Sequence, residues 1–239
     1  MSKHNFLDSF DMVYIINLES RVDRKKEMEA QLLKVGLSLT HNKITLFKAV
    51  KPTDAGEFPN IGAKGCFLSH LEVLKDCQLR QFKRILIFED DLNFVKKFNQ
   101  KFTSVIAKLD NEKWDIFYGD YRIENFEKIY SSCLKLIDPD ASIGTTNFIG
   151  FNGVVVEELI KYFEAMSSRL NGDALGGPMH VDGAYSWFRK DNRNFSTKVA
   201  TPTLGYQRSS NSDIAKPSFT KTIPFIRTLR VVLNKIRWQ

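Results

Sequence analysis

The sequence predicts an α/β fold: a single domain whose mostly parallel central sheet is flanked by helices. Short apolar runs rich in β-branched residues, typical of buried strands, recur at residues 12–18, 44–50 and 83–88. Segments with apolar side chains at helical spacing alternate with these runs. Hydrophobic residues make up 43% of the 239 residues, which is enough for a sizeable core and excludes a disordered or fibrous protein.

The first part of the chain supplies these elements in order. Residues 12–18 predict the first strand, and residues 21–36 predict a charged helix that ends at Gly36. Residues 44–50 predict a second strand. Residues 51–63 contain two prolines and two glycines and therefore predict a loop.

The rest of the chain continues the alternation. Residues 67–81 predict a helix with a leucine stripe, and residues 83–88 predict the clearest buried strand. The later elements are a helix at 98–109, a strand at 114–118, a strand at 148–156 interrupted by two glycines, a helix at 157–170, a glycine-rich loop at 171–178, a short helix at 182–189 and a strand at 199–204.

The formal net charge of +7 is unevenly placed. No acidic residue follows Asp213, and residues 214–239 hold six lysines and arginines. Residues 1–213 are therefore nearly balanced, which argues against a nucleic-acid partner. We expect one domain at 1–213 and a basic tail at 214–239.

The tail has the pattern of a basic amphipathic helix over residues 223–239. Its apolar stripe has two possible roles. It could pack on the domain, or it could bind an anionic membrane surface with Trp238 at the interface. The apolar face consists of Phe225, Ile226, Leu229, Val232, Leu233 and Ile236. The basic face consists of Arg227, Arg230, Asn234 and Arg237.

Cysteine use and the N-terminus bear on the compartment. The three cysteines, Cys66, Cys77 and Cys133, form no CxxC pair, which predicts reduced thiols and neither a disulfide framework nor a zinc site. The first residues lack an apolar secretory signal, and no run of 18 apolar residues could span a membrane. We expect a cytoplasmic protein.

The strongest chemical clue is an acidic triplet, Glu89, Asp90 and Asp91, directly after the strand at 83–88. Ligands of open α/β sheets bind outside the carboxyl ends of the strands. In an extended segment Glu89 and Asp91 point to the same side, where two carboxylates suit Mg²⁺ or Mn²⁺ beside a phosphate. The alternative is a solvated turn or a helix N-terminus, where acids are also favoured.

Basic and amide side chains follow the first predicted strand. Asn17, Arg21 and Arg24 lie at its carboxyl end, from which the arginines could reach a diphosphate or a uracil-type base. The alternative is that both arginines face solvent on the first turn of a helix.

Three sequence blocks resemble glycosyltransferase family 25. They are Tyr-Ile-Ile-Asn-Leu at 14–18 followed by Asp23-Arg24, Gly-Cys-Phe-Leu-Ser-His at 65–70, and Ile-Leu-Ile-Phe-Glu-Asp-Asp at 85–91. That family includes bacterial lipopolysaccharide and lipooligosaccharide core glycosyltransferases and domains of collagen-modifying enzymes. The resemblance covers roughly residues 12–214.

The resemblance implies a GT-A-like fold and an inverting transfer from a UDP-sugar, usually UDP-galactose and sometimes UDP-glucose. It implies a DxD-like motif for Mn²⁺ or Mg²⁺, here the acidic triplet with Glu in place of the first Asp. We expect Asp91, Glu89 and His180 to bind the metal, although a lone His is more often structural. The expected donor-binding residues are Asn17, Arg21, Arg24, Ser69, Asp90 and Gln207.

An inverting transfer needs a general base for the acceptor hydroxyl. Asp182 is the first candidate, because it lies between the glycine-rich loop and a helix with three aromatic residues. Asp120, after the strand at 114–118, is the second. The alternative for Asp182 is a helix N-cap.

The sequence thus predicts a peripheral glycosyltransferase on the inner face of the cytoplasmic membrane, acting on a lipid-linked oligosaccharide. A nucleotidyltransferase is the enzymatic alternative, but the glycine-rich phosphate loop of many such enzymes is not evident. The non-enzymatic alternative is a peripheral membrane or nucleic-acid binding module whose acidic residues are structural. The donor sugar, the linkage and the acceptor cannot be predicted from sequence.

Overall fold

The computed structural model describes residues 6–124 and 132–208. Within them the chain forms a mixed α/β domain around one seven-stranded sheet, with the strand order β2-β1-β3-β7-β5-β8-β6. Strands β2, β1, β3, β5 and β8 run in one direction, and β7 and β6 run against them. The bounds are β1 Met12–Asn17, β2 Ile44–Lys48, β3 Arg84–Glu89, β5 Ile116–Tyr118, β6 Leu134–Ile137, β7 Phe148–Asn152 and β8 Thr197–Ala200.

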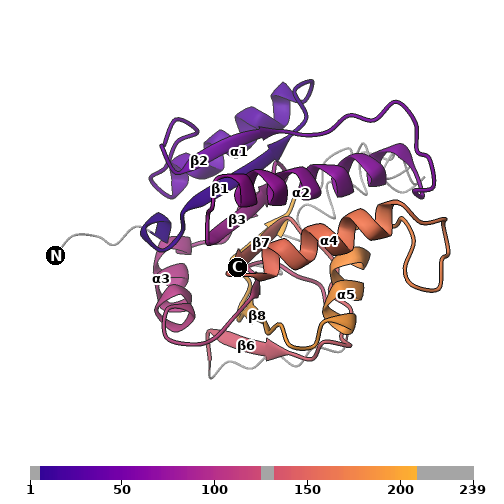
Figure 1. Ribbon diagram of the computed structural model, residues 1–239. Coiled ribbons are helices and arrows are strands. Elements are labelled where there is room, and N and C mark those ends of the chain that lie inside the picture. Colours follow the sequence, from indigo (N-terminus) through magenta and orange to yellow (C-terminus); the bar gives the residue numbers. More distant parts are fainter. Residues whose placement is uncertain (1–5, 125–131, 209–239) are drawn as a thin grey trace.

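Helices cover both faces of the sheet (Figure 1). One face packs against α2 (Ile61–Leu79), α4 (Val155–Ser167) and α5 (Val181–Asp191). The other packs against η1 (Phe6–Ser9), α1 (Val22–Lys34) and α3 (Phe98–Leu109). The predicted fold class, an α/β domain with a mostly parallel sheet flanked by helices, is confirmed.

Strand β1 shows why both faces need a cover. Successive side chains of a strand point to opposite faces. Tyr14 and Ile16 therefore join the core under α2 and α4, while Val13 and Ile15 join the core under α1 and α3. Every residue of β1 is buried, as expected of a strand with helices on both sides.

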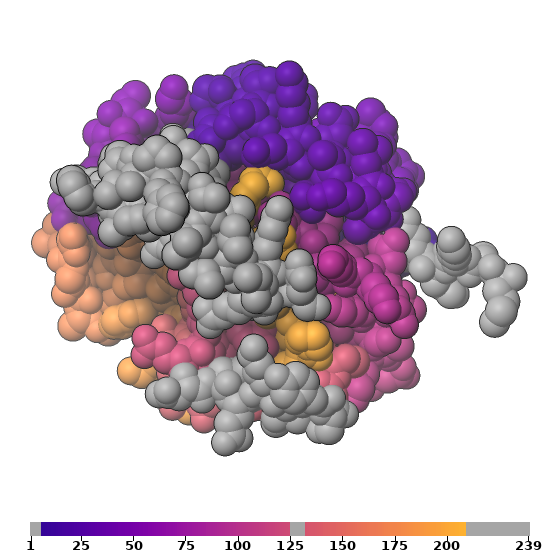
Figure 2. Space-filling model, turned by 180° about the vertical axis from the view of Figure 1, so that it is seen from behind, coloured from indigo at the N-terminus to yellow at the C-terminus, as the bar shows by residue number. Residues whose placement is uncertain are grey.

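A second, two-stranded sheet adjoins the end of β3. Strand β4 (Leu92–Phe94) pairs antiparallel with β9 (Gly205–Gln207), in a register that places Gln207 opposite Leu92. Neither strand is predicted by the sequence pattern, because three residues are too few to show a period. In the view from behind, the last described residues lie between indigo and magenta parts of the surface (Figure 2). Gln207 donates to Asp91 and Arg208 donates to the Asp90 carbonyl, so the late chain reaches the acidic triplet.

Several predicted boundaries were wrong. The predicted loop at 51–63 ends earlier, because α2 begins at Ile61, and the Asn60 side chain accepts from the backbone N–H of Ala63 at 2.8 Å. Gly150 does not interrupt β7: an added Cβ would lie 2.8 Å from Leu86 Cδ2. Glycine fits there because the Leu86 side chain of the neighbouring strand packs over it.

Two further expectations concern the ends of elements. The N-cap of α5 is His180, so the alternative role of Asp182 as the N-cap was wrong, and Asp182 lies in the first turn. The predicted tail helix at residues 223–239 and the boundary at 213–214 lie outside the described residues. Among the helices of the described part, none is long and apolar enough to cross a membrane.

Candidate active site

The candidate site lies where strands β1 and β3 end side by side. The chain leaves β1 to pair β2 on one side and later returns to pair β3 on the other, so the strand order reverses at β1. Such a switch point leaves a crevice outside the carboxyl ends of the strands, where α/β proteins bind ligands. Asn17 ends β1, Glu89 ends β3, and Asp120 follows β5 by two residues. The fold thus gathers the predicted polar residues at one edge.

The acidic triplet is not one extended segment. Strand β3 ends at Glu89, and Asp90 and Asp91 form a turn before β4. The expectation that Glu89 and Asp91 point to one side of an extended segment was therefore wrong. Their carboxylates have separate contacts: Glu89 accepts from the Thr146 hydroxyl at 2.7 Å, and Asp91 accepts from the Gln207 amide at 3.2 Å.

Asp90 is fully occupied by protein partners. Its carboxylate accepts from Arg24 Nη1 at 2.8 Å and from Asn17 Nδ2 at 2.7 Å, and its carbonyl accepts from Arg208 Nη2 at 2.9 Å. Burial raises the pKa of Asp90 even though Arg24 and Asn17 oppose that change. Asp90 therefore ties β1, α1 and the end of β9 to the turn.

Asp91 keeps one carboxylate oxygen available for a ligand. Arg24 Nη1 lies 3.6 Å from Oδ2, and Oδ1 is buried without a hydrogen-bond partner among the described residues. Burial, with the charges of Glu89 and Asp90, raises the pKa of Asp91 to about 7. A buried carboxylate oxygen left unsatisfied is costly. This oxygen fits a hard divalent cation, which prefers oxygen ligands.

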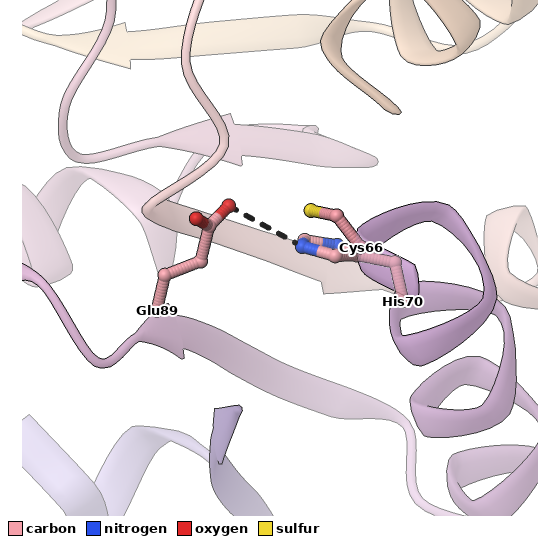
Figure 3. A group of neighbouring side chains, drawn as sticks. All are labelled: Cys66, His70 and Glu89. Carbon is pink, nitrogen blue, oxygen red and sulfur yellow. Dashed lines mark ion pairs between the residues drawn. The ribbon is translucent and has the colours of Figure 1, made fainter. Parts of the chain in front are cut away.

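Glu89 faces helix α2 (Figure 3). Its Oε1 lies 3.5 Å from Nε2 of His70, which is fully buried. Burial acts to raise the pKa of Glu89, but His70, Thr146 and Arg24 outweigh it and lower the pKa. Glu89 is therefore held in its ionised form, and Cys66 lies beside it.

The two candidate bases differ in exposure. Asp120 is 4% exposed, and burial raises its pKa to about 7, with Asp91 adding to the increase. Asp182 is half-buried in the first turn of α5, and its charge acts on the Cys66 thiol. Both acids therefore face the same region as the triplet. A base near neutrality that solvent or substrate can reach is suited to proton abstraction.

Three other predicted site residues, His180, Arg21 and Ser69, contact residues outside the acidic triplet. His180 is exposed at the start of α5, and no hydrogen bond or ion pair joins its imidazole to Asp91 in the described part of the chain. Arg21 forms two hydrogen bonds to Asp23, at 3.0 and 2.8 Å. Ser69 is buried. Its hydroxyl donates to the Gly65 carbonyl at 2.6 Å and accepts from the Val50 N–H at 2.8 Å.

The site includes residues that sequence reasoning did not select. Arg208 pairs with Glu27 at 2.7 Å and donates to Asn93 Oδ1 at 3.1 Å, which fixes the late chain over the turn. Thr146 holds Glu89. No pattern in the sequence places Arg208 or Thr146 beside the triplet, because Thr146 lies just before β7 and Arg208 just after β9, far from the triplet along the chain. The i, i+4 spacing of Cys66 and His70 was a usable signal, but the predicted helix at 67–81 begins after Cys66, whereas α2 includes both residues.

Comparisons with known proteins relate this chain to one family of glycosyltransferases. Residues 55–167, which include the acidic triplet, match the family model described as glycosyltransferase family 25 (LPS biosynthesis protein). A human protein named inactive glycosyltransferase 25 family member 3 is 28% identical over 137 residues, covering 50% of this chain and 23% of the relative. Procollagen galactosyltransferase 1-A of Xenopus laevis is 29% identical over 128 residues, covering 46% of this chain and 21% of the relative.

The chain spans less than a quarter of the length of these two relatives. Among solved structures, A197 from STIV has a TM-score of 0.45 and 12% identity, covering 87% of this chain and 97% of that one. The resemblance to glycosyltransferase family 25 that the three sequence blocks predict is confirmed, and residues 55–167 carry the family match.

Proposed function

We propose that this protein is a divalent-metal-dependent inverting glycosyltransferase that moves a hexose from a UDP-sugar to a lipopolysaccharide or lipooligosaccharide core acceptor. The observation that carries the proposal is the buried Oδ1 of Asp91, which has no hydrogen-bond partner among the described residues. It lies at the switch point of the sheet, where a nucleotide-sugar would bind. Galactose is the proposed sugar, because relatives are named galactosyltransferases.

The metal proposal rests on the donor set. Asp91 supplies the unsatisfied oxygen, and Glu89 supplies an ionised carboxylate that is 18% exposed. These hard ligands suit Mn²⁺ or Mg²⁺, and such a cation would supply positive charge beside the diphosphate leaving group. His180 remains a proposed third ligand with no contact in support. Arg24 and Asn17 position Asp90, and we propose that Arg24, Arg21 and Gln207 line the donor site.

The acceptor hydroxyl needs a base. We assign this role to Asp182, since it is half-buried and acceptor can reach it, whereas Asp120 is almost fully buried. Asp182 takes the proton as the hydroxyl oxygen attacks the anomeric carbon, and the bond to the UDP oxygen breaks. Asp120, with its pKa near 7, is the second candidate.

The acceptor and the location are argued from charge and from the family description. The family model is described as an LPS biosynthesis protein, which supports a lipid-linked acceptor. The tail at 214–239 adds six positive charges and an amphipathic pattern that suit an anionic leaflet. We therefore propose a cytoplasmic protein that binds the inner face of the membrane.

The test of the function is a donor and acceptor screen. Purified protein with Mn²⁺ is given UDP-galactose or UDP-glucose, and UDP release and sugar transfer are measured with lipooligosaccharide core or with a collagen peptide. Metal-dependent transfer of galactose to the core supports the whole proposal. Transfer only to the peptide would contradict the proposed acceptor, and no UDP release from any donor, with or without Mn²⁺, would contradict the activity.

The membrane proposal has its own experiment. Flotation with anionic and with neutral vesicles compares the full chain with a chain truncated after Ser218. We expect binding to anionic vesicles that weakens with salt and is lost on truncation. Unchanged binding of the truncated chain to anionic vesicles would contradict a role for the tail.

A further inference from the structure

Three side chains with metal-binding atoms converge between α2 and the end of β3 (Figure 3). Cys66 and His70 are four residues apart on α2, so they lie on one face of the helix. Glu89 reaches this face from the end of β3. The thiol, an imidazole nitrogen and a carboxylate oxygen all lie within 4.8 Å of one another.

The imidazole of His70 is positioned as a ligand. The residue is fully buried, with an exposed fraction of 0%, and its Nε2 has no hydrogen-bond partner among the described residues. Its other nitrogen, Nδ1, lies 3.1 Å from the Tyr185 hydroxyl. When Nδ1 carries the proton and donates to Tyr185, the lone pair of Nε2 faces Cys66 and Glu89. A hydrogen bond on the second ring nitrogen is typical of a metal-ligating His.

The donor types select the cation. Mg²⁺ and Mn²⁺ favour oxygen, whereas a sulfur, nitrogen and oxygen set suits Zn²⁺. We propose that Cys66, His70 and Glu89 form a Zn²⁺ site with three protein ligands and an open fourth position. Cys66 and Glu89 are partly exposed, which gives a cation a way in, while His70 lies at the closed end.

The expectation of no zinc site rested on the missing CxxC pair. A site assembled from one helix and one strand needs no such pair, so that expectation did not consider this arrangement. A simple His70–Glu89 ion pair explains the 3.5 Å contact but leaves the convergence of Cys66 unexplained. The proposal goes beyond the proposed function, since Zn²⁺ binding is measured without any sugar transfer. It competes with that function for Glu89: Zn²⁺ bound between Cys66, His70 and Glu89 would leave Asp91 as the carboxylate ligand of the Mn²⁺ or Mg²⁺ proposed above.

The test uses Co²⁺ as a spectroscopic substitute for Zn²⁺. The full chain is reduced, stripped with a chelator and titrated with Co²⁺, and the thiolate-to-cobalt charge-transfer absorption is recorded. Zn²⁺ and Mg²⁺ are then added as competitors. The variants are Cys66→Ala and Glu89→Gln, and the matched control is Cys133→Ala, which also removes a partly buried free thiol. Circular dichroism checks that each variant is folded.

We expect the charge-transfer band in the wild type and in Cys133→Ala, its loss in Cys66→Ala, and its bleaching by Zn²⁺ but not by Mg²⁺. Glu89→Gln is expected to weaken Zn²⁺ binding by about 10-fold or more. Absence of the band in the folded wild type, or its persistence in Cys66→Ala, would overturn the proposal. Binding in Glu89→Gln equal to that of the wild type would remove Glu89 from the site and contradict the three-ligand set.

Discussion

Arg24 and Asp90 form a buried ion pair, with Nη1 2.8 Å from Oδ1 and side-chain exposures of 12% and 8%. The next residue, Asp91, keeps a carboxylate oxygen without a hydrogen-bond partner in the described part of the chain. Adjacent acids of one turn therefore have different roles. Asp90 holds the turn against β1 and α1, and Asp91 remains available for a ligand.

Arg24→Ala is expected to destabilise the fold by about 3 kcal/mol, because removing one partner leaves the Asp90 charge buried and unpaired. Urea unfolding of the variant measures this change. Arg21→Ala is the matched control, since Arg21 lies at the same edge but pairs with the exposed Asp23. A variant at Arg24 as stable as the Arg21 control would show that the buried pair does not hold the turn.

Asp120→Asn is expected to reduce the pH dependence of stability. The pKa of Asp120 is about 7 in the folded protein, above the value near 4 of an unfolded Asp. Between these values the Asp120 carboxyl holds its proton in the folded state but not in the unfolded state, so the contribution of Asp120 to stability falls as pH rises from 4 to 7.

Removing this carboxyl should flatten that fall by an amount on the order of 2 kcal/mol, as measured by unfolding at a series of pH values. Asp54→Asn is the control, because Asp54 is exposed and Lys64 lowers its pKa. An Asp120→Asn profile that matches the wild type over this range would contradict the raised pKa.

Asp182→Asn is expected to keep UDP binding and lose sugar transfer by roughly 10²- to 10⁴-fold, since the amide cannot accept the acceptor's proton. Calorimetry with UDP and a transfer assay measure the two properties separately. Glu157→Gln, which changes an exposed acid on α4, is the control. Full transfer by Asp182→Asn together with loss in Asp120→Asn would move the base to Asp120.

Gly150→Ala is expected to destabilise the sheet by about 1–3 kcal/mol, because the added methyl group would meet Leu86 Cδ2 at 2.8 Å and the Ile85 carbonyl at 3.2 Å. Gly144→Ala is the matched control, since its nearest contact is 3.6 Å. Thermal unfolding compares the two. Equal stability of both variants would show that β7 can shift to accept the methyl group.

Much of the fold follows from sequence periodicity. The long elements are predictable because burial on one or both faces imposes a period, as in α3, whose predicted bounds at 98–109 are those observed. Strands β4 and β9 are too short to show one, and only tertiary pairing defines them. The β4–β9 pair also explains how Gln207 reaches Asp91, a contact across more than a hundred residues.

The composition of the site was more predictable than its geometry. Strand ends at a switch point correctly indicate that Asn17, Arg24 and the acidic triplet meet. The sequence does not show that the chain turns at Asp90. It therefore did not predict that the Glu89 carboxylate faces α2 while the Asp91 carboxylate faces β9. Side-chain direction at the end of a strand depends on the turn that follows.

The most direct test of the central claim is Mn²⁺-dependent UDP release from UDP-galactose by Asp91→Asn. The wild type and Glu157→Gln, which changes an exposed acid on α4 away from the site, are assayed beside it, with and without EDTA. We predict that EDTA abolishes the wild-type rate, that Mn²⁺ restores it, and that folded Asp91→Asn loses at least about 100-fold in rate. Normal Mn²⁺-dependent UDP release by folded Asp91→Asn would contradict the account.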